Sequence, residues 1–400
     1  MTAPQATEAP EVTLDWVIDN DTHISEPPDL FESRLPAKWR DQAPRVVRNE
    51  DSGFEVWSVG PEQQAMIPIG HTAVAGWPEP FPAAPSGFAE IPKAAHDPHA
   101  RIEYMDSLRI WAMALYPNVG GFGSQAFLNL GDPELMLACV QAYNDFLTDW
   151  CSVAPNRLIP ISAMPFWDVE ASVREIERCA KAGHKGVLFT GAPQDHGMPA
   201  LASPHWNPLW ECAQSHALPV SFHIGSGEFT NSGWTPERIA LYGSGGINAQ
   251  TSIGLFLENG RQIIDLLFSG ILPRYPELKF VSVESGIGWV PFVLEAADYS
   301  LDQGEVSERH VFDLKPSEYF HRQVYACYWF EQDAPRHFER VGVDKILFET
   351  DFPHPTCLYG NVEETIEAGL GPESEEVREK ILYGNSAALY GLEPSVTAKA

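Results

Sequence analysis

Eight short apolar segments recur along this chain, and they limit its possible folds more than any other feature. Several are nearly continuous apolar runs, as expected of strands buried on both faces. Helical patterns lie between most of them, and this alternation indicates parallel βαβ units that close into a (β/α)8 TIM barrel. The predicted strands are Trp16–Asp21, Ile110–Tyr116, Leu158–Met164, Gly186–Thr190, Leu218–His223, Leu278–Glu284, Val324–Trp329 and Lys345–Glu349. The clearest predicted helices are Glu134–Trp150, Val169–Ala182, Asn207–His216, Ser252–Ile271, Ala334–Val341 and Ser374–Leu389.

Two segments interrupt this alternation. Residues 24–100 contain no clear barrel strand, but the hairpin signal Asp51-Ser52-Gly53 lies among three predicted antiparallel strands. We expect residues 24–100 to form an inserted subdomain over one barrel end, within a single domain that spans 1–400. The second segment, Gly225–Gln250, is rich in Gly, Ser and Asn and predicts a loop over the barrel mouth. The antiparallel strands are predicted at Arg45–Arg48, Phe54–Val59 and Gln64–Ile69.

Charge and composition exclude several classes of partner. The formal net charge is −29, which repels nucleic acid and anionic lipid, so we expect neither nucleic acid nor membrane as a partner. No stretch approaches the roughly 20 apolar residues that cross a bilayer, and Met1–Pro10 lacks the pattern of a signal peptide. The six cysteines form no C-x-x-C pair and suit a reducing compartment. These features predict a cytoplasmic enzyme.

Polar residues at the ends of predicted strands are the candidate site, because this fold places its reacting groups there. Asp21 and His23 end the first strand, and residues two apart on an extended chain point to the same side. The competing interpretation is an Asp that caps a turn beside a surface His. His223 ends the fifth strand before a Gly-rich loop, where a histidine with only a structural role in the core is the alternative.

Asp351 ends the eighth strand. No helix starts directly after it, and Phe352-Pro353 indicates an extended turn, which argues against a helix cap. If the strand count is correct, two imidazoles and two carboxylates converge on one barrel mouth. Such a set suits zinc, manganese or iron and leaves a coordination position for water or substrate.

Several motifs are spread over nearly the whole chain outside the first insertion. Together they resemble the amidohydrolase superfamily, in the branch that includes aminocarboxymuconate semialdehyde decarboxylase. The motifs are Asp19-Asn20-Asp21-Thr22-His23-Ile24-Ser25-Glu26-Pro27, Ala142-Tyr143-Asn144-Asp145-Phe146, Phe222-His223, Pro316-Ser317-Glu318-Tyr319-Phe320, Glu349-Thr350-Asp351-Phe352-Pro353-His354 and Ile381-Leu382-Tyr383-Gly384-Asn385-Ser386-Ala387.

The resemblance implies a (β/α)8 barrel with one divalent metal ion, held here by Asp21, His23, His223 and Asp351. Many relatives have His-x-His at the first strand, whereas this chain has Asp-x-His. We expect zinc, with manganese and iron as alternatives.

Three further residues have roles that the sequence leaves open. Glu284 ends the sixth strand, where the decarboxylase has a histidine, and is an acid–base residue, an extra ligand, a partner for a substrate amine or a structural carboxylate. His354 binds substrate or orients a ligand. Glu26 follows the first two candidate ligands closely and is itself a ligand or a neighbour of one.

The implied reactions also remain open. We favour non-oxidative decarboxylation of a small carboxylic acid, because the branch is rich in it, with Asp351 or a nearby acid protonating the carbon that loses carbon dioxide. In a metal-dependent hydrolase of an amide or ester, Asp351 instead takes a proton from water. A metal-dependent oxygenase using Glu26 or Glu284, or a catalytically silent partner of an active homologue, are further alternatives. We expect a small-molecule substrate and a homo-oligomer, or an assembly with a homologous subunit.

Overall fold

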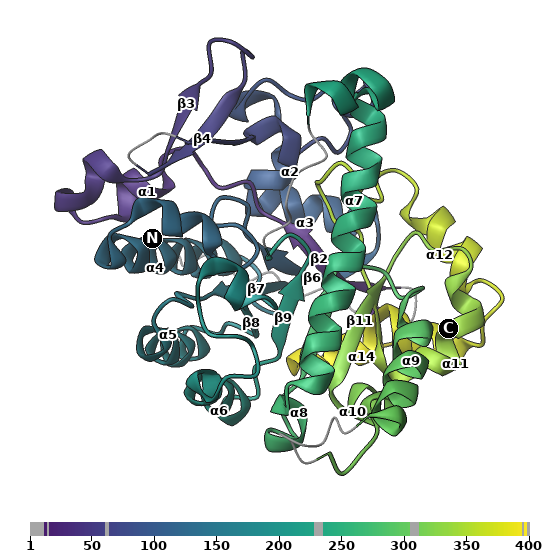
Figure 1. Ribbon diagram of the computed structural model, residues 1–400. Helices are drawn as coiled ribbons and strands as arrows, with labels where there is room; N and C mark the ends of the chain where they lie inside the picture. The colour runs from purple at the N-terminus through teal and green to yellow at the C-terminus, as the bar shows by residue number, and fades with distance from the viewer. Residues whose placement is uncertain are drawn as a thin grey trace, which may run out of the picture.

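Eight parallel strands form one sheet at the centre of the molecule (Figure 1). The computed structural model describes residues 12–13, 16–60, 64–227, 235–304, 312–393 and 396–397. The strand order is β12-β11-β10-β9-β8-β7-β6-β2, which confirms the predicted barrel. The strands are β2 Val17–His23, β6 Ile110–Tyr116, β7 Leu158–Ala163, β8 Gly186–Leu188, β9 Val220–His223, β10 Phe280–Val283, β11 Val324–Tyr328 and β12 Ile346–Phe348.

The barrel closes where β2 meets the segment after β12. The His23 N–H donates to the Phe352 carbonyl at 2.7 Å, and the Asp351 N–H donates to the Asp21 carbonyl at 2.9 Å. Thr22 and Phe352 also pair as a parallel bridge. Three candidate site residues therefore lie on the seam itself, so the bonds that close the barrel also fix the distances between those residues.

Helices surround the strands (Figure 1). The predicted helices are present, except that the first half of Ala334–Val341, Ala334–His337, is a 3-10 helix. Carboxylates cap two of them: Asp132 accepts the N–H groups of Glu134 and Leu135, and Asp168 accepts that of Ala171. The predicted helix Ser374–Leu389 is a continuous run whose middle, Lys380–Gly384, is π-helical. The helices around the barrel are α3 Pro98–Ser107, α4 Pro133–Cys151, α5 Val169–Lys181, α6 Asn207–Ser215, α7 Pro236–Phe268, α8 Ile271–Arg274, α9 Val290–Gln303, α10 Pro316–Gln323, α11 Phe338–Val341, α12 Val362–Leu370, α13 Glu375–Glu379 and α14 Asn385–Tyr390.

The prediction of a loop over Gly225–Gln250 is wrong from Pro236 onward. Helix α7 begins at Pro236, and Thr235 caps it by accepting the Arg238 N–H. Its glycines favoured a loop on propensity, but Gly243 alone leaves the helical conformation (φ 73°, ψ 159°). The buried Ile247 anchors the turn that follows, so tertiary packing overrides propensity here. Part of the predicted loop, residues 228–234, lies outside the described residues.

The inserted segment contains the predicted antiparallel sheet, in the order β3-β4-β5. Its aromatic side chains join the barrel core, because the Phe31 ring lies 5.7 Å from that of Trp57 and 5.8 Å from that of Phe127. The segment lies over one end of the barrel (purple in Figure 1). That it is a subdomain of one barrel domain stays a prediction. Its elements are α1 Leu30–Arg34, β3 Arg45–Arg48, β4 Glu55–Val59, β5 Gln64–Pro68 and α2 Lys93–His96.

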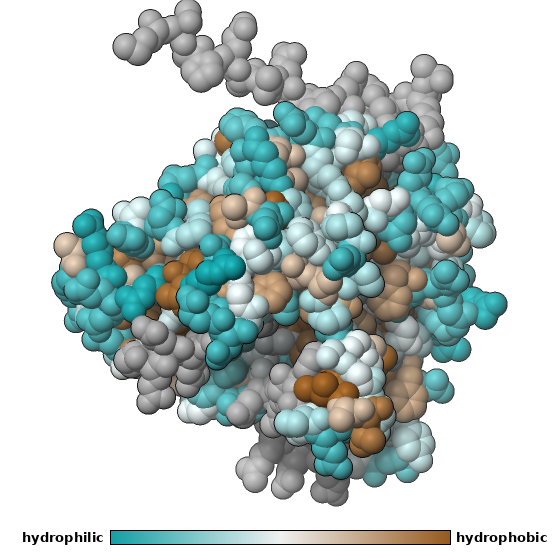
Figure 2. Space-filling view, turned by 90° about the horizontal axis from the view of Figure 1, so that it is seen from above, coloured by the Kyte–Doolittle hydropathy of each residue, from teal (hydrophilic) through white to brown (hydrophobic). Residues whose placement is uncertain are grey.

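The surface seen from above is mostly hydrophilic, with separate hydrophobic spots (Figure 2). Within the described ranges, no helix has both the length and the apolar character needed to cross a bilayer. All six cysteines are free, and all but Cys357 are buried.

Candidate metal centre

The six candidate site residues lie in one buried cluster. Asp21 and His23 come from β2, and His223 ends β9. Glu284 directly follows β10, and the loop after β12 supplies Asp351 and His354. Their ligand atoms form two overlapping groups, within each of which all atoms lie within 4.8 Å of one another. The two groups are Asp21, His23, His223 and Glu284, and His23, Glu284, Asp351 and His354.

The imidazoles of His23 and His223, at the ends of two strands, face each other in an arrangement that a cation would stabilise. The Nδ1 atom of His23 lies 3.1 Å from the Pro117 carbonyl oxygen, and that of His223 lies 3.0 Å from the Ile224 carbonyl oxygen. Because a carbonyl oxygen only accepts, each Nδ1 carries the hydrogen and each Nε2 presents a lone pair. These two Nε2 atoms are only 3.2 Å apart. Two lone pairs at that separation repel, and a shared metal ion removes the repulsion.

Carboxylates complete the set of oxygen and nitrogen donors. The Asp21 Oδ1 atom lies 3.3 Å from His23 Nε2 and 3.4 Å from His223 Nε2. Neither Asp21 oxygen has a hydrogen-bond partner within the described part of the chain, although both are buried. Glu284 Oε2 is 3.6 Å from His223 Nε2, and Asp351 Oδ1 is 3.6 Å from His23 Nε2. Imidazole and carboxylate ligands in this arrangement fit a divalent transition ion.

Burial and the nearness of other ionisable side chains shift the pKa values of the clustered residues. Burial, reinforced by the charge of His354, lowers the pKa of His23 to about 3, which keeps its ring neutral and able to bind a cation. Burial and the neighbouring charges of Asp351 and Asp21 raise the pKa of Glu284 well above its ordinary value.

His354 is held between two oxygen acceptors. Its Nδ1 lies 2.9 Å from Asp351 Oδ1, and its Nε2 lies 2.9 Å from Asn118 Oδ1. The Asn118 amide cannot turn its nitrogen toward His354, because that nitrogen donates to the Ile24 carbonyl at 2.9 Å. Burial disfavours charge on His354, but the Asp351 carboxylate outweighs burial and raises the pKa of the imidazole. Burial raises the pKa of Asp351. Both raised pKa values favour keeping a proton on the Asp351–His354 pair.

Glu26 belongs to neither of the two candidate ligand groups. Its Oε1 atom accepts the backbone N–H groups of Asn118 and Val119 at 2.8 and 3.0 Å. It therefore braces the loop that carries Asn118, and Asn118 in turn contacts His354.

Sequence analysis missed two buried carboxylates that support the cluster. Asp19 accepts the Thr350 hydroxyl at 2.5 Å and the Thr350 N–H at 2.9 Å, which fixes the end of β12. Glu349 Oε2 accepts the Glu284 N–H at 3.1 Å. Asp19 stands two residues before Asp21, and Glu349 stands two residues before Asp351. Because side chains two apart on a strand point to the same side, this spacing could have indicated both carboxylates from the sequence.

Two of the candidate residues have strained backbones. Glu284 and Asp351 are not glycines, yet their φ angles are 60° and 59°. Such left-handed conformations are costly for residues with a Cβ atom and concentrate at functional sites. Here they turn both carboxylates away from the strand direction and into the cluster.

Comparison with known proteins identifies the family. The amidohydrolase family model matches residues 66–392. The chain belongs to the amidohydrolase family. Among relatives of this family, gamma-resorcylate decarboxylase from Polaromonas sp. (strain JS666 / ATCC BAA-500) is 25% identical over 301 residues, covering 73% of this chain and 86% of that protein.

Solved structures share the fold. An amidohydrolase from Mycobacterium avium subsp. paratuberculosis K-10 superposes with a TM-score of 0.73 at 23% identity, over 94% of this chain and 99% of that one. A 5-carboxyvanillate decarboxylase from Novosphingobium aromaticivorans DSM 12444, complexed with manganese and 4-hydroxy-3-methoxy-5-nitrobenzoic acid, has a TM-score of 0.67 at 19% identity, over 96% and 100% of the two chains. The buried His/Asp/Glu cluster of this chain and the manganese in that structure both support a divalent metal ion.

We expect protein purified without chelator to contain about one divalent transition ion per chain, because the facing imidazole lone pairs and unpaired Asp21 oxygens need a cation. Elemental analysis for zinc, manganese and iron measures this content. A chelator should also lower the melting temperature, since the ion binds only the folded chain.

The His223→Ala variant should lose most of the ion, whereas the matched His216→Ala variant should retain it because His216 is exposed on the outer surface. Less than about a tenth of an equivalent of the three metals together in the wild-type chain would contradict the prediction.

Proposed function

We propose that this chain is a metal-dependent, non-oxidative decarboxylase of a small aromatic carboxylic acid. The observation that carries the proposal is the 2.9 Å contact between Asp351 Oδ1 and His354 Nδ1 beside the facing imidazoles. The named activities of the relatives, gamma-resorcylate and 5-carboxyvanillate decarboxylation, support the aromatic substrate class. We further propose Asp21, His23, His223 and Asp351 as the ligands, with zinc as the expected ion and manganese as its main competitor.

The hydrogen bonds around His354 favour a proton donor over a base. Because Asn118 Oδ1 only accepts, His354 Nε2 carries a hydrogen. If Asp351 were an unprotonated base beside a neutral His354, the Nδ1 lone pair would face a carboxylate oxygen at 2.9 Å. A proton on either atom turns this repulsion into a hydrogen bond. Decarboxylation requires such a donor, whereas hydrolysis first requires a base to take a proton from water.

In the proposed decarboxylation, Asp351, His354 and Asn118 are the side chains that handle the proton. When bound, the ion supplies positive charge that holds the substrate carboxylate and a neighbouring oxygen. The bond between the ring and the carboxyl carbon breaks, carbon dioxide leaves, and the electron pair stays on the ring carbon. His354 Nδ1 passes its proton through the Asp351 carboxylate to that carbon, so Asp351 is an ionised ligand before and after the transfer. Asn118 holds the His354 ring in line through this transfer.

Glu284 is a second candidate proton carrier. Its raised pKa keeps the buried carboxyl protonated, and its position after β10 brings it to the same cluster. The bond from its N–H to Glu349 fixes the main chain independently of the side-chain carboxyl. We propose that the Glu284 carboxyl stabilises or protonates the reacting ring and is not a structural brace.

We also propose that the protein is a homo-oligomer, with one face of α7 and α9 as the contact. Ile253 and Leu257 are 57% and 58% exposed and lie one turn apart on α7, while Phe292 on the contacting α9 is 76% exposed. The stretch from Ile239 to Leu257 contains no charged residue, although the chain has a net charge of −29. Such a face lets two copies meet without like-charge repulsion, and interface cores are depleted of charge.

The Asp351→Asn variant should lose about 10²–10⁴-fold in turnover, because it removes the proton-carrying oxygen. The assay follows carbon dioxide release from gamma-resorcylate and 5-carboxyvanillate by the metal-loaded enzyme. In D₂O, the product should carry one deuterium at the carbon that lost the carboxyl group. The exposed Asp344→Asn substitution is the matched control.

The pH profile tests the role of Asn118. Activity requires the protonated pair, so it should fall as pH rises through the raised pKa of His354. The Asn118→Leu variant removes an acceptor that stabilises the imidazolium, so the fall should move to lower pH. An unchanged alkaline limb would exclude Asn118 as a positioning residue, and ester or amide hydrolysis without deuterium transfer to carbon would refute the decarboxylase proposal.

The Glu284→Gln variant should lower turnover by about 10²-fold or more, as expected for a group that transfers a proton. Its melting temperature should barely change, because the backbone bond to Glu349 remains. Steady-state kinetics and thermal unfolding are measured on the same preparations. Full activity with a lowered melting temperature would assign Glu284 a structural role.

The Leu257→Glu variant should dissociate the oligomer, because it places a like charge on both copies at the centre of the contact. Light scattering coupled to size-exclusion chromatography gives the mass in solution. Val153→Glu, which adds a charge at an exposed apolar residue outside this face, should leave the mass unchanged. A wild-type chain that is monomeric at every concentration tested would contradict this proposal.

A further inference from the structure

Arg101 is a buried cation beside the end of β2. It lies near the start of α3, directly after the inserted segment, and is 0% exposed. Its guanidinium contacts carbonyl oxygens, a hydroxyl, a sulfur atom and aromatic rings, and within the described ranges it forms no ion pair with a carboxylate. Because a charge that is removed from water without an opposite charge is costly, the contacts of Arg101 need a functional explanation.

The bonds that close the barrel leave one carbonyl without a backbone donor. The His23 N–H donates to the Phe352 carbonyl at 2.7 Å, and in a parallel ladder the His354 N–H would next donate to the His23 carbonyl. That N–H instead donates to the Asp351 carbonyl at 2.9 Å, and Pro353 has no N–H. The ladder therefore stops at His23, a candidate metal ligand.

The Arg101 guanidinium supplies the missing donor. Its Nη2 atom donates to the His23 carbonyl at 2.7 Å, and its Nη1 atom donates to the Thr22 hydroxyl at 3.3 Å. The central carbon of the guanidinium lies 4.8 Å from the centre of the Phe352 ring, which is within the range of a cation–π contact. Arg101 thus contacts both sides of the seam, at a candidate ligand in β2 and at the residue that follows Asp351.

The inserted segment holds the same seam through its main chain. The Ala94 carbonyl accepts the Arg101 Nε–H at 2.6 Å, which orients the planar guanidinium toward β2. On the other side of the seam, the Val74 and Ala75 N–H groups donate to the Pro353 carbonyl at 3.0 and 3.2 Å. The insertion therefore fixes both Arg101 and the chain after β12.

We propose that Arg101 is a positioning residue for the metal site, which holds His23 and the segment of Asp351 at the separation that binds the ion. This inference rests on the proposed ligands and not on the decarboxylation reaction. The site uses the geometry of the guanidinium donors, because the positive charge by itself repels a metal cation. A lysine at this position would keep the charge but lose the planar fork that reaches several acceptors at once.

The Arg101→Lys variant should bind the ion about 10- to 100-fold more weakly than the wild type, the usual cost of removing a group that orients a ligand. The dissociation constants of zinc and manganese are measured by competition with a chromophoric chelator. Arg101→Met removes both the fork and the charge and should also weaken binding. Wild-type affinity in Arg101→Lys together with tighter binding in Arg101→Met would mean that only the charge matters, and would overturn the inference.

The matched control is Arg157→Lys. Arg157 is also buried, at 4% exposed, and donates to the Ile110 and Trp111 carbonyls at 3.1 and 2.8 Å. These two residues begin β6, at the barrel end opposite the metal cluster. Arg157→Lys should therefore lower the melting temperature and keep the wild-type metal affinity.

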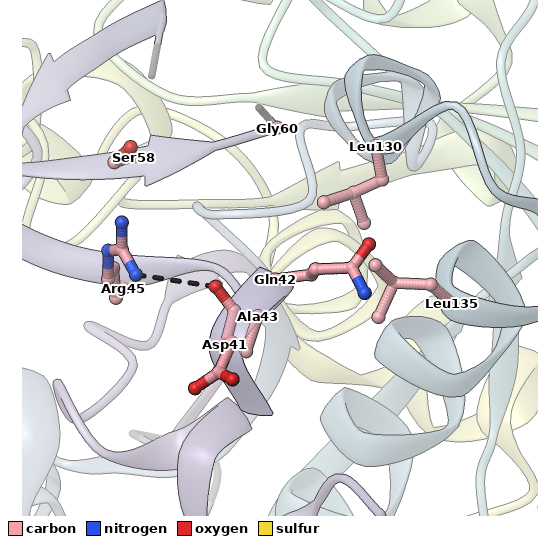
Figure 3. A pocket seen from close by; sticks show the side chains of 8 residues that line it. All are labelled: Asp41, Gln42, Ala43, Arg45, Ser58, Gly60, Leu130 and Leu135. Carbon is pink, nitrogen blue, oxygen red and sulfur yellow. Dashed lines mark hydrogen bonds between the residues drawn. The ribbon is translucent and has the colours of Figure 1, made fainter. Parts of the chain in front are cut away.

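Arg45→Lys is the control for an exposed arginine. Arg45 lies in β3 of the inserted segment and donates to the Asp41 carbonyl, beside a cavity of about 250 Å³ between that segment and α4 (Figure 3). The described residues that line this cavity include none of the candidate ligands. This substitution should change neither the melting temperature nor the metal affinity.

Thermal unfolding with and without the ion separates positioning from stability. Addition of the ion should raise the melting temperature of Arg157→Lys about as much as that of the wild type. At the same ion concentration the rise should be smaller in Arg101→Lys, because stabilisation by a ligand follows its affinity. If Arg101→Lys has a lower melting temperature but an unchanged rise and an unchanged dissociation constant, Arg101 is only structural and the inference is overturned.

Two further outcomes separate this inference from the proposals that precede it. A wild-type chain that binds none of zinc, manganese and iron would refute the proposed ligands, and this inference with them. If the wild type binds an ion but releases no carbon dioxide from any aromatic acid, while Arg101→Lys still weakens binding, the decarboxylase proposal fails and the role of Arg101 stands.

Discussion

The His23 and His223 Nε2 atoms approach each other to 3.2 Å, a cation between them would remove the repulsion of their lone pairs, and much of the surrounding structure holds these rings in place. His23 is fixed by the carbonyl oxygen of Pro117, which follows β6, and His223 by that of the adjacent residue Ile224. The bonds that close the barrel hold β2 against the segment after β12, which brings Asp21 and Asp351 to the same point. The bonds that close the fold and the geometry of the candidate metal site therefore depend on one another.

A chain of contacts links the metal cluster to the inserted segment. Glu26 accepts the backbone N–H of Asn118 at 2.8 Å, Asn118 Oδ1 lies 2.9 Å from His354 Nε2, and His354 Nδ1 lies 2.9 Å from Asp351 Oδ1. The same loop presents Phe122 and Gln125 to a cavity whose far wall includes Trp57. One loop therefore contacts both His354 and the cavity lined by Trp57, so a change that shifts this loop would reach both places.

The sequence predicted the barrel strands because buried parallel strands read as apolar runs, and it predicted the site because its polar residues stand where those runs stop. The first half of α7 was missed because its glycines match a loop locally, whereas the burial of Ile247 is a long-range effect. Asn118 was missed for a related reason: it lies in a Gly-rich loop, and its importance comes from His354, 236 positions away. Short-range patterns identify candidate ligands, but not the residues that contact them from distant parts of the chain.

The left-handed conformations of Glu284 and Asp351 have a consequence for evolution under heat. A glycine at either position would relieve the backbone strain, so selection for thermostability alone would favour it. The same replacement would delete a carboxylate from the centre of the barrel. At these two positions, a gain in folding stability would therefore cost a carboxylate of the candidate site. A protein that adapts to high temperature has to gain its stability through substitutions at other positions.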